Sequence, residues 1–152
     1  MSYAAWSVVF GEQPSAAKWN ILGTNDAYFD SVISRFVAID PGVVVVNAVD
    51  PANTNWTSVD ITANTSATAT AVLLHAVGTS TDTTRHLYLR TTGSGDAQDS
   101  TTTILTTQVA NVQVHNTTAV KLDASQSFDY SVSNANMSAV TLVVRGYWET
   151  VA

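Results

Sequence analysis

The chain of 152 residues contains no cysteine, which excludes disulfides, thiolate metal sites and cysteine nucleophiles. Charged side chains are also scarce: they make up 12% of the residues, against about 25% in an average soluble domain. The six Lys and Arg residues are scattered rather than clustered, and the net charge is −6. Nucleic acid and anionic membrane surfaces are therefore poor partners for this chain.

Long apolar runs are missing as well. The longest aliphatic run is Val43–Val46, whereas a membrane span needs about 20 apolar residues. The first ten residues, MSYAAWSVVF, lack the basic and apolar regions of a secretory signal. We therefore expect a protein that is made in a cytoplasm and has neither a membrane span nor a targeting signal.

Hydroxyl side chains take the place of the missing charges, since 37 of the 152 residues are serine or threonine. Hydrophobic residues still make up 45%, which is too many for an intrinsically disordered chain. A length of 152 residues is enough for one compact domain and leaves little room for a second.

The stretch from Pro14 to Phe36 carries helix signals. Pro14 suits the first turn of a helix, and Gly23 can end it. Residues 24–26, Thr-Asn-Asp, then form a second N-cap with an acidic first turn. Apolar residues follow at positions i, i+3, i+4 and i+7, namely Phe29, Val32, Ile33 and Phe36. The pattern predicts a kinked amphipathic helix.

An apolar stripe of this kind on a short helix needs a large apolar partner. We therefore assign residues 1–39 to a helical segment for attachment or oligomerisation. Its expected contact residues are its large apolar side chains: Trp6, Phe10, Trp19, Leu22, Phe29, Val32, Ile33 and Phe36.

From Asp40 onward, apolar and polar residues alternate with the period of a half-buried strand. Strands are predicted over residues 43–49, 56–61, 71–77, 85–91, 103–107, 109–115, 120–122, 128–132 and 140–148, after a turn at Pro41-Gly42. Short, evenly spaced strands predict a mainly β protein, with an antiparallel, jelly-roll-like β-sandwich over residues 40–152. Residues 92–102 are expected to form a mobile loop tip. Trp148 shares the alternation of Leu142 and Val144 and is predicted to lie in the core.

No catalytic motif stands out, and we expect neither enzymatic activity nor a cofactor. There is no GxSxG nucleophile elbow, and most aspartates lie in turns, where they bond to backbone N–H groups. The three histidines, His75, His86 and His115, lie on separate predicted strands without the spacing of a metal motif. Three such histidines could converge in the fold, but we expect no metal site.

One predicted strand carries an outward row of polar and aromatic side chains, formed by His86, Tyr88 and Arg90. Aromatic and arginine side chains are enriched at protein interfaces. The row could therefore be a subunit interface, a ligand contact or plain surface. Four aromatic residues could stack on a sugar, or fill the sandwich or an interface instead: Trp56, Tyr88, Tyr147 and Trp148.

Residues 6–27, WSVVFGEQPSAAKWNILGTNDA, resemble a recurring N-terminal segment of structural proteins of tailed bacteriophages. The part of the chain that follows, which ends in the strand residues Gly146-Tyr147-Trp148, is similar to small β-sandwich modules of phages. The resemblance implies a virion component, attached to other virion proteins through its N-terminal segment. A homotrimer is the oligomeric state expected by analogy with such modules.

The resemblance leaves the place on the particle open. We expect first a tail-fibre or tail-tip protein whose sandwich contacts the host surface, with a saccharide as the possible ligand. The alternatives are a capsid decoration or head-fibre protein, held on the shell by its N-terminal segment, and a standalone lectin-like module.

Overall fold

The computed structural model describes residues 19–20 and 34–150, in which residues 36–149 form one compact unit. Trp19 and Asn20 are helical. The strands, in chain order, are β1 (Ser34–Val49), β2 (Thr57–Asp60), β3 (Ala69–Ser80), β4 (His86–Thr91), β5 (Thr103–Thr106), β6 (Val114–Lys121), β7 (Ser127–Val132) and β8 (Met137–Thr150). A single 3₁₀ turn, η1 (Thr62–Asn64), lies between β2 and β3. No helix in this part of the chain is long and apolar enough to cross a membrane.

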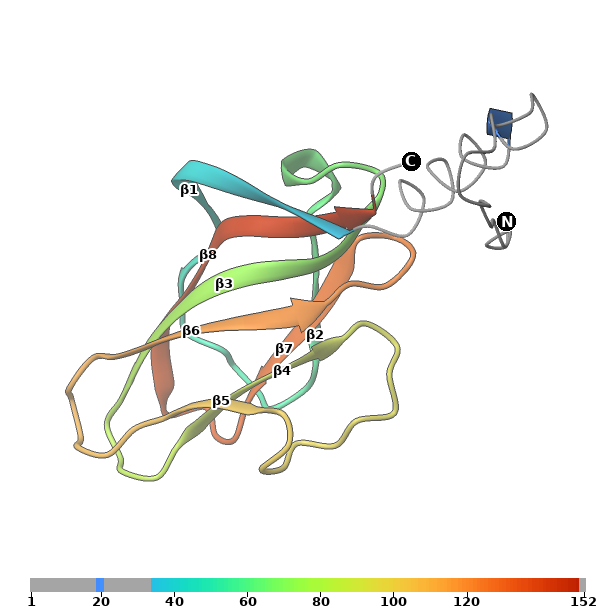
Figure 1. The fold of residues 1–152 in the computed structure, drawn as a ribbon. Helices are drawn as coiled ribbons and strands as arrows, with labels where there is room; N and C mark the ends of the chain where they lie inside the picture. Colours follow the sequence, from blue (N-terminus) through green and yellow to red (C-terminus); the bar gives the residue numbers. More distant parts are fainter. Residues whose placement is uncertain (1–18, 21–33, 151–152) are drawn as a thin grey trace, which may run out of the picture. The chain divides into compact units, whose positions relative to one another are not determined.

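The strands form two four-stranded sheets, in the orders β1-β8-β3-β6 and β2-β7-β4-β5 (Figure 1). The first strand thus pairs with the eighth, the second with the seventh, the third with the sixth and the fourth with the fifth. This is the order produced when one long antiparallel hairpin is rolled up into two sheets, the jelly-roll arrangement. The predicted antiparallel sandwich is confirmed.

The core lies between the two sheets and follows the alternation of the sequence. Within β3, Val72, Leu74 and Ala76 are fully buried, and their neighbours in the strand face the other way. The largest fully buried apolar side chains come from both sheets and from the loop after β2: Phe128, Ile61, Leu74, Leu87, Met137, Leu142, Val72, Val132, Val140 and Val144. Half of these side chains are valine or isoleucine, the β-branched residues that fit a pleated, half-buried surface.

The predicted helix is wrong in its last residues, because β1 already begins at Ser34. Phe36, the last residue of the predicted apolar stripe, lies in this strand. The expected turn at Pro41 is also absent: Pro41 follows Asp40 through a cis peptide bond inside β1. β1 is an edge strand of its sheet, and an edge strand tolerates a proline because one side of its backbone needs no partner.

Trp148 does not lie in the core, contrary to the prediction from strand alternation. β8 pairs with β3 through Val144 opposite Leu74 and Gly146 opposite Leu73, so that Arg145 is an extra residue in a β-bulge. A bulge of one residue reverses the face to which all later side chains point. Beyond it, Tyr147 packs against the core, whereas Trp148, although partly buried, does not.

The bulge brings Trp148 beside Phe36 on the outer face. Their ring centroids are 4.9 Å apart, and the rings are tilted by 53°. Gly146 makes room for this pair, because a Cβ at that position would lie 2.7 Å from Cε2 of Phe36. Phe36 remains 43% exposed.

The predicted strands 109–115 and 120–122 are replaced by one strand, β6. Val109 and Val112 lie in the preceding turn with exposed fractions of 57% and 50%. The turn contains Asn111 with a φ of 60°, a conformation that asparagine tolerates better than most residues. The alternation of valines here is therefore not a sign of burial.

Candidate ligand-binding cleft beside β4 and β5

β4 has the predicted alternation. Leu87 and Leu89 point into the core and are 0% and 5% exposed. His86, Tyr88 and Arg90 consequently lie on the opposite, outer face of the sheet β2-β7-β4-β5. The structure thus places the predicted polar-aromatic row on one face of one strand.

The loop between β4 and β5 folds over this face. Arg90 Nη1 donates a hydrogen bond of 3.0 Å to the carbonyl oxygen of Asp96, and Gln98 Nε2 donates one of 2.8 Å to Ser131 Oγ on β7. Thr102 Oγ1 donates to the carbonyl oxygen of Ala97 within the loop. The bonds from Arg90 and Gln98 attach the loop, which we expected to be a mobile tip, to β4 and β7. Tyr88 is only 6% exposed as a result.

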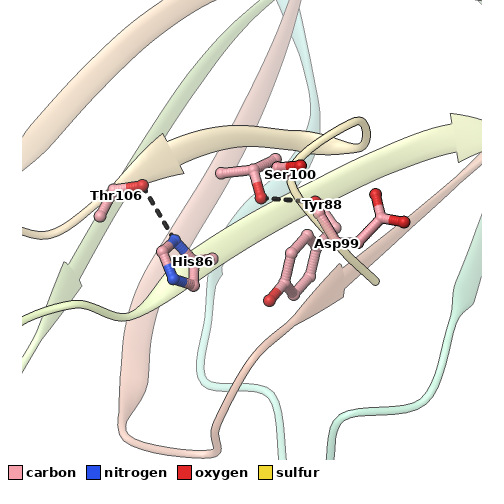
Figure 2. A pocket seen from close by; sticks show the side chains of 6 residues that line it. His86, Tyr88, Asp99, Ser100 and Thr106 are labelled. Carbon is pink, nitrogen blue, oxygen red and sulfur yellow. Dashed lines mark hydrogen bonds between the residues drawn. The ribbon is translucent and has the colours of Figure 1, made fainter. Parts of the chain in front are cut away.

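A cleft of about 410 Å³ opens between the loop and the strands. Its lining combines two ring side chains of β4 with hydroxyl and carboxylate groups of the loop and of β5: His86, Tyr88, Asp99, Ser100, Thr103 and Thr106. Figure 2 shows the rings of His86 and Tyr88 side by side on β4, with Asp99 and Ser100 above them on the loop. The ring centroids are 5.9 Å apart.

Hydrogen bonds fix several of these side chains. His86 Nδ1 and Thr106 Oγ1 are 2.9 Å apart, and this bond joins β4 to β5 across the floor of the cleft (Figure 2). Thr103 Oγ1 donates a bond of 2.7 Å to the carbonyl oxygen of Asp99. The polar groups of the cleft are therefore largely oriented before any ligand arrives, which lowers the entropic cost of binding.

Asp99 is the only carboxylate among the lining residues. Its Oδ1 accepts bonds from the Thr101 hydroxyl at 2.6 Å and from the Thr101 N–H at 2.8 Å. These bonds, the side-chain bond first, lower the pKa of Asp99 below its ordinary value, so the carboxylate stays ionised into acid conditions. Both bonds use Oδ1, so that a ligand hydroxyl could donate to Oδ2 without breaking them.

Arg90 does not line the cleft but belongs to a buried polar cluster beside it. Arg90 Nε forms an ion pair of 3.0 Å with Asp129 Oδ2 on β7, and the two side chains are 16% and 6% exposed. Thr92 Oγ1 donates a 2.8 Å bond to the other carboxylate oxygen. The Arg90 guanidinium also lies 4.2 Å from the ring centre of Trp56, a cation–π contact.

The three residues of the predicted row thus have two different surroundings: His86 and Tyr88 line the cleft, whereas Arg90 holds the adjacent cluster together. Trp56, expected as a possible sugar-stacking residue, contacts Arg90 and packs edge-on to Tyr88 at 6.4 Å. Asp129 was not predicted as a functional residue, although an aspartate between Phe128 and Tyr130 in a strand, outside any turn, is a usable signal.

Most residues of the predicted attachment stripe lie outside the described residues, namely Trp6, Phe10, Leu22, Phe29, Val32 and Ile33. Of the two others, Trp19 is helical, and Phe36 lies in β1 beside Trp148. Among the residues that the structure describes, no group of three or more His, Cys, Asp or Glu side chains could hold a metal ion.

In comparisons with known proteins, no protein-family model and no curated protein matches the chain.

Proposed function

We propose that this chain is a structural protein of a bacteriophage particle, in the tail fibre or tail tip, whose jelly roll binds a saccharide of the host surface. The observation that carries the binding role is the cleft between β4, β5 and residues 92–102. The N-terminal resemblance of residues 6–27 supports the virion role. Jelly rolls occur in both viral capsid and lectin domains, but a fold alone does not assign a function.

The chemistry of the cleft suits a neutral sugar. His86 offers a partly exposed ring surface beside the largely buried Tyr88, and the hydroxyls of Ser100, Thr103 and Thr106 can donate or accept hydrogen bonds. The carboxylate of Asp99 accepts bonds from sugar hydroxyls and repels acidic sugars. Among the described lining residues, no hydrogen bond joins the Ser100 hydroxyl to His86, whose Nδ1 bonds to Thr106 Oγ1 instead, and we therefore propose binding rather than catalysis.

The N-terminal segment is the proposed attachment to other virion proteins, and a homotrimer is the proposed oligomer. Closed cyclic symmetry is the common arrangement of identical subunits. The alternative location is the capsid, where the same segment would attach a decoration or head-fibre protein to the shell. A second alternative, a standalone lectin-like module, would need no attachment.

Replacing Asp99 by asparagine should weaken saccharide binding by the full-length chain about tenfold or more, because a charged acceptor would be lost from the cleft. The measurement is a glycan array with neutral and acidic glycans, followed by calorimetric titration of the strongest ligand. We expect the strongest signals from neutral glycans.

Asp60→Asn is the matched control. Asp60 also accepts a 2.8 Å bond from the N–H two residues later, that of Thr62, and its pKa is likewise lowered by Thr62. It lies on β2, at the opposite edge of the same sheet. A flat array response at high protein concentration, or equal losses in both variants, would contradict the proposed binding site.

A further inference from the structure

A pair of histidines meets on the sheet that does not carry the cleft. His75 on β3 lies between the fully buried residues Leu74 and Ala76, so its side chain is on the outer face. β3 and β6 pair with Val77 opposite His115 and His75 opposite Thr117, which makes the two histidines diagonal neighbours. His115 Nδ1 and His75 Nε2 are 3.4 Å apart, and the ring centroids are 5.5 Å apart.

We propose that His75 and His115 form a binding site for a divalent transition metal ion of the Zn²⁺ type. Imidazole nitrogens are ligands that such ions prefer. Two nitrogen ligands of a tetrahedral Zn²⁺ lie about 3.3–3.4 Å apart, because each Zn–N bond is about 2.0–2.1 Å long. The two ring nitrogens are in hydrogen-bond contact at 3.4 Å, and a shared ion in place of the proton between them fits the same separation.

Thr117 prepares His75 for this role. Its Oγ1 is 3.1 Å from Nδ1 of His75. When Nδ1–H donates to that hydroxyl, the lone pair of the neutral ring lies on Nε2, the nitrogen that faces His115. A metal-binding histidine is normally oriented by a bond of this kind from its other ring nitrogen.

The surroundings leave room for the rest of the coordination shell. The residues opposite His75 in the register are Val143 and Thr117, and Val77 lies opposite His115, so these positions add no positive charge. β6 is an edge strand of its sheet and His115 is exposed, which gives solvent access to the ion. Because the described residues add no third His, Cys, Asp or Glu to the pair, water completes the shell.

The test is calorimetric titration of the full-length chain with zinc chloride, beside the variants His75→Gln and His115→Gln. We expect one zinc ion per chain and at least tenfold weaker binding in either variant, since each removes one of two protein ligands. His86→Gln is the matched control, because the chain has only three histidines and His86 lies in the cleft on the other sheet. It should leave zinc affinity unchanged.

Nuclear magnetic resonance of the histidine rings keeps the test decisive if a variant folds poorly. In the unaltered chain, zinc should shift the ring signals of His75 and His115 and spare those of His86. Equal zinc affinity in all three variants, or shifts confined to His86, would overturn the proposal, as would the absence of saturable binding below millimolar zinc.

Discussion

Replacing Asp129 by alanine should lower the free energy of unfolding by about 3–5 kcal/mol, because it leaves the largely buried Arg90 guanidinium without its counter-charge. The 3.0 Å ion pair lies between side chains that are 16% and 6% exposed. The change also removes the acceptor of the Thr92 hydroxyl. Urea denaturation, with the slope compared between variants, measures the loss.

The chain contains a second ion pair of the same length for comparison. Arg85 Nη2 and Asp82 Oδ2 are also 3.0 Å apart, but their side chains are 32% and 42% exposed. Asp82→Ala should therefore lower the free energy of unfolding much less than Asp129→Ala does, as is usual for solvated pairs. Equal losses for Asp82→Ala and Asp129→Ala would show that burial does not set the strength of the Arg90 cluster.

Replacing Gly146 by alanine should lower the free energy of unfolding by about 1–3 kcal/mol through overpacking. The added Cβ would lie 2.7 Å from both Cε2 of Phe36 and the carbonyl oxygen of Val37, and still closer to Cζ of Phe36. The Phe36 ring can rotate away, but the Val37 oxygen belongs to the backbone of β1 and moves only if that strand shifts. Thermal and urea unfolding of the variant give the magnitude.

Gly95→Ala serves as the control for Gly146→Ala. A Cβ at Gly95 meets no heavy atom within 4 Å, and this glycine lies in the loop over the cleft face. Its replacement should change stability by no more than about 0.5 kcal/mol. A neutral Gly146→Ala would mean that Phe36 does not occupy the space over β8.

Alternation predicted the faces of β4 well, and this strand pairs with β7 without a register shift. The outward row of His86, Tyr88 and Arg90 was predicted, and the alternate residues Leu87 and Leu89 are buried. The same rule failed for Trp148, because a bulge at Arg145 reverses the faces of β8. A bulge is a property of two paired strands, so the sequence of one strand does not reveal it.

The start of the sandwich was misplaced for a related reason. Phe36 fits a helical spacing with Phe29, Val32 and Ile33, yet it lies in β1 beside Trp148. Local periodicity is a weak guide where two patterns meet, and in this case pairing with β8 decides the conformation of the chain.

The cleft was only half predictable. His86 and Tyr88 follow from strand alternation, but the contributions of Asp99 and Ser100 depend on how residues 92–102 fold back onto the sheet. The bonds from Arg90 and Gln98 that hold the loop join residues far apart in sequence or on different elements. The contact between His75 and His115 was not predictable from the sequence either, because it depends on the strand order that places β6 beside β3.

The proposed virion role is the central claim. Its most direct test is electron microscopy of bacteriophage particles purified from cultures that produce the chain, labelled with a gold-conjugated antibody against it. The proposal predicts label at the tail fibres or tail tip of every intact particle. Label confined to the head would contradict the tail location in favour of the decoration alternative. Particles that carry no label, and no peptides of the chain by mass spectrometry, would contradict the virion role itself.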